Sequence, residues 1–199
     1  MKLPKLQIGD MQIEKPIIQG GMGVGISLSG LASAVAEQGG IGVISSVALG
    51  LISEDDNLRG KEANIELLKR EIQKARNKTD GIIGVNIMVA LSEYEELVKT
   101  SIEEEADIVF IGAGLPLKLP GSFTSEYWQN KKTKVGVIVS SARAADIIFK
   151  MWDKRYDCIP DAVVVEGPKA GGHLGFKKEQ IDDPNYSLEN ILPNVKAKM

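Results

Sequence analysis

Residues 161–173 read DAVVVEGPKAGGH, and this segment decides the fold class that the sequence predicts. Its first half is a short, almost continuous apolar run, which is typical of a parallel β-strand covered on both faces. The run ends in a Gly-rich stretch, as expected where a strand gives way to a loop. A polar stretch at residues 54–57 predicts another loop. Five earlier runs of the same apolar kind lie at residues 16–19, 41–45, 82–88, 107–114 and 135–139.

Amphipathic stretches separate these runs and predict helices, because their apolar residues recur at helical spacing. The clearest of them extends from about residue 61 to residue 76. Ser92 and Glu95 form a capping-box pattern ahead of another helix. A last amphipathic piece spans residues 188–195, where Pro193 weakens the helical pattern. Six βα units without a hairpin signal therefore predict a parallel α/β fold.

Two parallel architectures compete, an open doubly wound sheet and a (β/α)8 barrel. The glycines at residues 20–25 read GGMGVG, which does not give the dinucleotide-binding pattern GxGxxG in any register. The second run ends in Ser45-Ser46 instead of the acidic residue that would hold a ribose. The sequence therefore favours a TIM-type (β/α)8 barrel, which has eight units in about 250 residues. We expect residues 1–199 to form a single domain with about six of these units, incomplete at its C-terminus.

The composition excludes several classes of function. Lys and Arg number 24 against 27 Asp and Glu, so the net charge of −3 offers no broad positive field to nucleic acid or to an anionic membrane. No apolar run approaches the ~18 residues that span a bilayer, and the N-terminus lacks the apolar core of a secretion signal. A single His and a single Cys exclude two-His and Cys-rich zinc motifs, so no metal site is predicted. We expect a cytoplasmic protein.

Small residues dominate the carboxyl ends of the expected strands, which is where chemistry gathers in a parallel α/β fold. Glycine lets the backbone approach a flat ligand closely, although for any single glycine a tight turn is the simpler interpretation. Asn86 offers a donor and an acceptor to the edge of a heteroaromatic ring. Met22 could line the face of such a ring. Taken together, the strand ends predict a ligand site.

His173 follows Gly171-Gly172 just beyond the last apolar run. Imidazole side chains ordinarily titrate near pH ~6.5 and suit proton transfer near neutrality, whereas the alternative interpretation is a surface histidine without a role. Glu166, at the end of the same run, could orient His173, bind the ligand or merely end the strand. Cys158 precedes the run, on the face of a barrel that serves stability, so we expect it to pack inertly.

Three segments of the chain carry a resemblance to a known family: PIIQGGMG at residues 16–23, GVNIM at residues 84–88 and EGPKAGGHLG at residues 166–175. Together they resemble the FMN-dependent nitronate monooxygenases, formerly called 2-nitropropane dioxygenases. The related FMN-dependent enoyl-acyl-carrier-protein reductases look similar. The AGGHxG segment is the most specific part, and the resemblance runs along essentially the whole chain. It implies a (β/α)8 barrel with a smaller extra region and FMN at the C-terminal face of the barrel.

The resemblance also implies a site and a reaction. The residues that would bind FMN are Gly21, Met22, Gly23, Asn86, Glu166, Gly171 and Gly172. His173 would lie beside the flavin as the catalytic base and remove the acidic C–H proton next to the nitro group of a nitroalkane. The implied oxidoreductase converts this small-molecule substrate, or its nitronate, with O2 into a carbonyl compound and nitrite. In that family the flavin phosphate is gripped by loops after the seventh and eighth strands, which we expect to lie beyond this sequence.

Two other functions stay open on the sequence. The first is an NADH-dependent enoyl-thioester reductase on the same flavin scaffold. The segment Asn86-Ile87-Met88 slightly favours this alternative. The second is a non-catalytic barrel fragment whose exposed sheet edge is covered by a partner chain. The physiological substrate is not fixed by the sequence. The sequence does not fix the oligomeric state either, and a homo-oligomer stays open.

Overall fold

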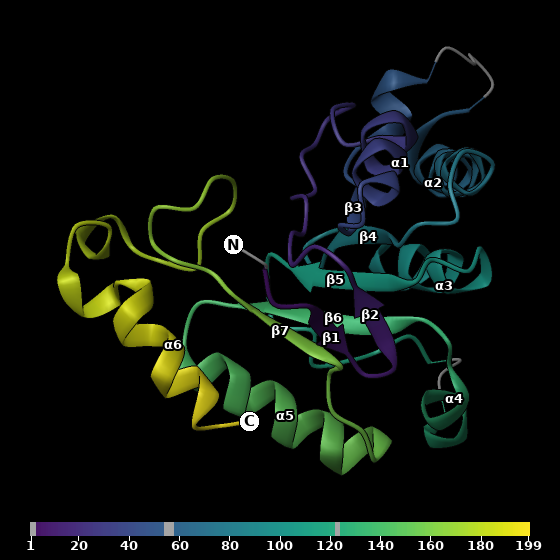
Figure 1. Cartoon of the computed structure of the whole chain (residues 1–199). Coiled ribbons are helices and arrows are strands. Elements are labelled where there is room, and N and C mark those ends of the chain that lie inside the picture. The colour runs from purple at the N-terminus through teal and green to yellow at the C-terminus, as the bar shows by residue number, and fades with distance from the viewer. Residues whose placement is uncertain (1–2, 54–57, 122–123) are drawn as a thin grey trace.

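The computed structural model describes residues 3–53, 58–121 and 124–199, so the polar loop expected at residues 54–57 lies outside the described residues. Five parallel strands form one sheet, whose strand order follows the chain order (Figure 1). This order has no reversal point, which a doubly wound sheet requires, and is that of a βα barrel. The predicted barrel-type α/β class is therefore confirmed. The strands are β3 (Gly42–Ser45), β4 (Ile83–Met88), β5 (Ile108–Gly112), β6 (Lys134–Val139) and β7 (Ala162–Val165).

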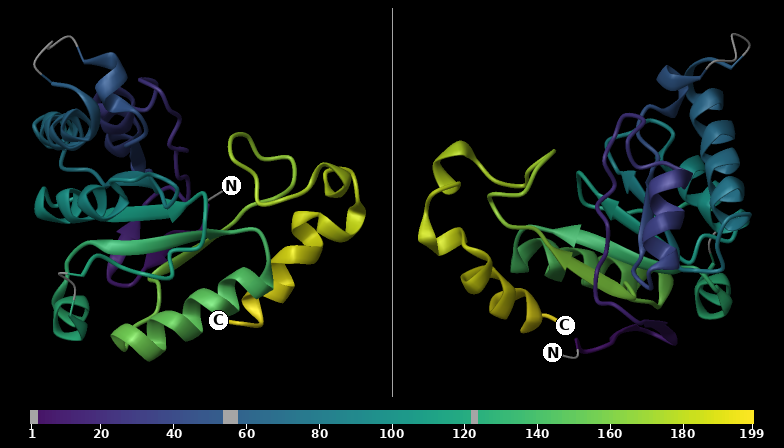
Figure 2. Two further views of the ribbon diagram at one scale, coloured as in Figure 1. Left: turned by 180° about the vertical axis from the view of Figure 1, so that it is seen from behind. Right: turned by 45° about the horizontal axis from the view of Figure 1, so that its top comes forward.

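Helices connect the strands and cover the outer face of the sheet (Figure 1). The helices predicted at about residues 61–76, after Ser92 and at residues 188–195 are all present. Two further views place α6 and the segment before it beside α5 and β7, at the other end of the strand order from α1 and α2 (Figure 2). The helical elements are α1 (Ser29–Glu37), η1 (Leu49–Ile52), α2 (Gly60–Arg76), α3 (Tyr94–Glu103), α4 (Ser125–Asn130), α5 (Ala142–Tyr156), η2 (Lys178–Gln180), η3 (Pro184–Tyr186) and α6 (Leu188–Lys196).

The two faces of the sheet belong to separate apolar clusters, because side chains alternate along each strand. Val85, Val109 and Val137 belong to the large cluster that includes buried residues of the helices. Ile108 and Phe110 belong to a smaller cluster on the inner face. Glycine makes room there: a Cβ on Gly136 of β6 would lie 2.9 Å from the Phe110 ring. The inner face is therefore filled by alternating large and small residues, as in the interior of a barrel.

The first apolar run, residues 16–19, was expected to be a strand, and this expectation is wrong. Only Ile18 makes a β-bridge, a parallel one to Ile41. Ile41 N–H donates to Ile17 O at 2.9 Å, and Gln19 N–H donates to Ile41 O at 3.0 Å. Pro16 has no N–H to extend this pairing, and the chain turns away at the glycines that follow Gln19. The run still occupies the sixth position along the sheet, beside the start of β3.

The expected absence of a hairpin is also wrong. Strands β1 (Leu6–Ile8) and β2 (Met11–Ile13) form an antiparallel pair joined by Gly9 and Asp10, with Gly9 at a φ of +59°. The signal was the two-residue turn Gly-Asp between the matching triplets LQI and MQI. Side chains of both strands are buried in the inner cluster. Asp10 also pairs with Lys134, the first residue of β6, so the hairpin covers the amino ends of the strands.

Helix boundaries differ from the expectation at α3. The capping box predicted from Ser92 and Glu95 is not formed, because the N-cap of α3 is Glu93 and makes no side-chain capping bond. The Ser92 hydroxyl donates to the Glu93 carboxylate at 2.8 Å instead. Helix α6 continues through Pro193, although proline lacks the N–H that would bond to the preceding turn. Tertiary packing of Ile191 and Val195, both buried, outweighs this loss.

A buried carboxylate joins the first two helices and makes a prediction about stability. Glu71 of α2 accepts the Ser29 N–H at the start of α1 at 2.8 Å and the Lys74 ammonium at 2.7 Å. Burial raises the pKa of Glu71, but the hydrogen bonds from Lys74 and Ser29 outweigh it, and the net pKa lies below the ordinary 4.5. Glu71→Ala should lower the free energy of unfolding by about 1–3 kcal/mol at pH 7, because it leaves the Ser29 N–H unpaired.

The pH dependence of this effect follows from the sign of the shift. A carboxylate whose pKa is lowered by folding stabilises the protein fully above its unfolded pKa and loses this effect as pH falls through the folded pKa. The stability difference between wild type and Glu71→Ala should therefore shrink below about pH 4.5, as measured by urea unfolding at several pH values. Glu66→Ala is the control, since the pair of Glu66 with Arg70 is exposed to solvent. A difference that is independent of pH would contradict the assignment.

Candidate active site

The carboxyl ends of the five parallel strands meet at one edge of the sheet, and polar residues gather there on the inner face. Strand register puts Ser45, Asn86 and Phe110 in one row across β3, β4 and β5. Since side chains alternate, Ser140 and Glu166 point to the same inner side as Gly136 and Ala162, four residues before each of them. The sheet thus aims an amide, two hydroxyls and a carboxylate at one region.

The loop at residues 20–27 owes its shape to Ser27, which is fully buried. Its hydroxyl accepts hydrogen bonds from Met22 N–H at 2.9 Å and from the Gln19 side-chain amide at 2.8 Å, and donates to Gly20 O at 3.1 Å. The Gln19 carboxamide oxygen in turn accepts the Val43 N–H of β3 at 3.0 Å. One serine and one glutamine therefore tie the glycine loop to the sheet.

This anchoring brings the first two predicted binding segments together. Gly21 packs so closely on the Asn86 side chain that a Cβ at this position would overlap the Asn86 Cβ. Gly23 lies near β3, where a Cβ would come within 3.2 Å of Val47 and 3.4 Å of the Ser45 hydroxyl. Met22, between them, is exposed. The structure thus brings the glycine loop and Asn86 into contact, and the glycines keep their backbone uncovered.

A buried polar atom at this place lacks a partner. Among the described residues the Ser45 hydroxyl is buried without a hydrogen-bond partner, which is uncommon in folded proteins and calls for an explanation. The Asn86 side chain has only a long hydrogen bond, from Nδ2 to Phe110 O at 3.4 Å, within the described part of the chain. A bare glycine backbone beside an unpaired hydroxyl and a loosely bonded amide fits a flat ligand with polar edges.

The remaining predicted residues form a second group at the β7 end of the sheet. Glu166 follows β7, and its carboxylate accepts the Gly175 N–H at 3.2 Å. His173 lies in the loop between them and is exposed, as are Gly171 and Gly172. A Cβ on either glycine would meet no atom within 4 Å, and Gly172 has a φ of +92°. The two groups share one edge of the sheet, with β5 and β6 between them.

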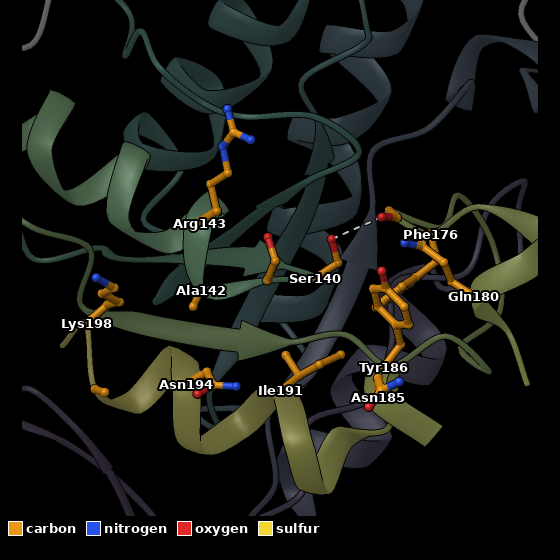
Figure 3. A pocket seen from close by; sticks show the side chains of 13 residues that line it. Ser140, Ala142, Arg143, Phe176, Gln180, Asn185, Tyr186, Ile191, Asn194 and Lys198 are labelled. Atoms are coloured by element: carbon orange, nitrogen blue, oxygen red, sulfur yellow. Dashed lines mark hydrogen bonds between the residues drawn. The ribbon is translucent and has the colours of Figure 1, made fainter. Parts of the chain in front are cut away.

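A cavity of about 600 Å³ adjoins the second group, between the start of α5 and helix α6 (Figure 3). Ser140 and Gly175 belong to its lining, together with the rings of Phe176 and Tyr186. These two rings meet edge to face with centroids 6.2 Å apart. The cavity therefore borders the histidine loop at the residues where that loop contacts β6.

Four residues of this region were not singled out as binding residues from the sequence: Gln19, Ser27, Ser45 and Ser140. Ser45 and Ser140 could have been found, because each is a polar residue at the carboxyl end of a predicted strand. Ser27 carries no motif, and its importance follows only from the bonds it makes in the folded loop.

Other groups behave as packing elements. Burial raises the pKa of the Cys158 thiol to about 11, so it is a poor source of thiolate near neutral pH, in line with the expectation of inert packing. Trp128 is buried, with its ring centroid 6.0 Å from that of Trp152. Within the described ranges, no three His, Cys, Asp or Glu side chains cluster as metal ligands would. The helices in those ranges are too short or too polar to cross a membrane.

Strand order and inner-face packing define a βα-barrel protein, and the polar strand ends at its carboxyl edge form a candidate ligand site. The sequence model of the nitronate monooxygenase family matches residues 5–197. The chain therefore belongs to the nitronate monooxygenase family, and the predicted family membership is confirmed. A probable nitronate monooxygenase of Bacillus subtilis (strain 168) is 28% identical over an alignment of 209 positions, which covers 92% of this chain and 55% of that protein.

Solved structures agree with the fold. FabK from Thermotoga maritima is 31% identical with a TM-score of 0.70, and the match covers 94% of this chain and 49% of FabK. A nitroalkane oxidase from Streptomyces ansochromogenes is 21% identical with a TM-score of 0.66, covering 92% of this chain and 56% of the oxidase, and this likeness concerns the fold alone. The chain spans about half the length of the relatives that it matches.

Proposed function

We propose that this chain carries the flavin site of an FMN-dependent nitronate monooxygenase, which oxidises alkyl nitronates or nitroalkanes with O2 to a carbonyl compound and nitrite. The observation that carries the proposal is the contact between Gly21 and the Asn86 side chain. It joins two segments 65 residues apart in the chain, both of which the family resemblance assigns to the flavin. Membership of the nitronate monooxygenase family supports the same reaction.

The glycine loop, Asn86 and Ser45 have the chemistry that the flavin ring system of FMN requires. The backbone of Gly21, Met22 and Gly23 would lie along the ring system, while Asn86 and the unpartnered Ser45 hydroxyl would hydrogen-bond its polar edge. When bound, FMN supplies the two-electron oxidation of the substrate and the reaction with O2. Glycine keeps its side of the site free of side chains, so the cofactor can approach the main chain directly.

His173 has the role of base in this proposal. The C–H bond next to a nitro group is acidic, and an imidazole can take its proton to leave the nitronate. Gly171 and Gly172 permit the exposed loop to bring the imidazole over the site without steric hindrance from their own side chains. Placing His173 and the substrate carbon together in a site that excludes water is what the protein itself contributes.

A titration of the 199-residue chain with FMN tests the proposal directly. We expect saturable quenching of flavin fluorescence with one site per chain, because the ring-binding groups described above all lie within it. Circular dichroism would show that the chain is folded under the same conditions. A folded chain that leaves flavin fluorescence unchanged would contradict the proposed site.

A reductase that uses NADH to reduce an enoyl thioester is the second candidate, and the 31% identity to FabK favours it. The electron donor separates the two functions. Under anaerobic conditions, rapid bleaching of the bound flavin by NADH would support the reductase. Bleaching by a preformed alkyl nitronate, with no rapid response to NADH, would support the monooxygenase.

A further inference from the structure

The loop that carries His173 is closed by a small set of contacts around Gly175. Gly175 N–H donates to the Glu166 carboxylate at 3.2 Å. Gly175 O accepts from the Ser140 hydroxyl at 3.3 Å, a bond drawn as a dashed line from Ser140 in Figure 3. Ser140 and Glu166 follow neighbouring strands, since Glu166 N–H donates to Val139 O at 2.8 Å. Both backbone groups of one residue are therefore held by the ends of β6 and β7. We call Ser140, Glu166 and Gly175 the loop clamp.

The other end of the loop is fixed by packing. Gly167 is buried against α6, where an added Cβ would lie 2.9 Å from Leu188 Cγ. Ala170 N–H donates to Gly167 O at 3.1 Å and closes a turn. Between this turn and the clamp, Gly171, Gly172 and His173 are exposed. The position of the imidazole therefore depends on the clamp, which lies only two residues after it.

We propose that Ser140 and Glu166 are positioning residues that set the place of His173 by holding Gly175. This inference rests on the proposed role of His173 as base. It assigns Glu166 a bond to the main chain of its own loop, where the resemblance alone implies contact with the cofactor. It also explains the glycine at position 175, because a Cβ there would overlap the Ser140 hydroxyl. A side chain at this position would force the loop away from β6.

Amide hydrogen exchange of the 199-residue chain tests the clamp without any turnover. Ser140→Ala and Glu166→Ala should each speed exchange of the Gly175 amide by about threefold to tenfold, as expected for the loss of one hydrogen bond. Ser140→Thr and Glu166→Gln keep a hydroxyl donor and a carbonyl acceptor, so both should restore protection. Ser141→Ala is the matched control, because Ser141 caps α5 through the Ala144 N–H and makes no hydrogen bond to the loop among the described residues.

Turnover then separates a positioning role from a purely structural one. Ser140→Ala should lower kcat for a neutral nitroalkane by about tenfold and spare a preformed nitronate, with rescue by Ser140→Thr. An unchanged Gly175 exchange rate in both alanine variants would overturn the clamp. Equal losses on the two substrates would overturn its positioning role. If His173→Asn itself left nitroalkane turnover intact, the proposed function would fail, while the exchange result would still judge the clamp.

Discussion

Replacing His173 by Asn should lower kcat for neutral nitroalkanes by about 10²- to 10⁴-fold, the usual contribution of a positioned general base. Asparagine has a similar size but cannot take the substrate proton. A preformed nitronate has already lost this proton, so its turnover should change little. Steady-state kinetics with a nitroalkane and with its nitronate, measured side by side, give the two values.

Lys169→Ala is the control for this experiment. Lys169 lies in the same loop and is exposed, and its ion pair with Asp182 is an exposed one with a separation of 3.4 Å. Both substrates should therefore react with the control variant as with wild type. If His173→Asn slows the nitroalkane and the nitronate by the same factor, His173 acts on a step after deprotonation and is not the base.

Gly21→Ala should weaken FMN binding by about tenfold to a hundredfold. The added methyl group overlaps the Asn86 side chain, and overpacking of this kind typically costs about 1–3 kcal/mol. Either Asn86 leaves its position or the loop moves off the sheet, and both changes disturb the surface on which the flavin would lie. The dissociation constant from fluorescence quenching measures the effect.

Gly30→Ala makes the same chemical change where there is room. Gly30 lies in α1, and a Cβ there would meet no atom within 4 Å. FMN affinity should stay at the wild-type value. Equal affinity in Gly21→Ala and wild type would show that the flavin does not use the contact between Gly21 and Asn86, and would remove the main support for the proposed site.

The strands of the sheet could be predicted from the sequence because a strand that is buried on both faces requires a continuous run of apolar residues. The run at residues 107–114 contains β5, and the run at residues 161–166 contains β7. Residues 16–19 have the same apolar character but form one bridge only. Composition alone cannot separate the two cases, since the difference depends on which neighbour is available for pairing.

The candidate site was predictable only in part. Glycines and a histidine at strand ends carry a signal in their residue type and position, and Gly21 and Asn86 do meet in the structure. Ser27 has no such signal, because its three hydrogen bonds join groups that only the folded loop brings together. The clamp on Gly175 is invisible for the same reason. It depends on the spacing of two adjacent strands and not on any local motif.

The hairpin of β1 and β2 makes the two ends of the sheet unequal. Ile8 and Ile13 fill the amino end of the inner face, and Asp10 pairs with Lys134 at the same end. The amino end of the inner face is therefore covered, whereas the carboxyl end, where Asn86 lies, carries the exposed glycine and histidine loops. Under the proposed function, substrate and product would pass the same two loops, so a change in either loop would alter how long a substrate stays bound as well as how it reacts.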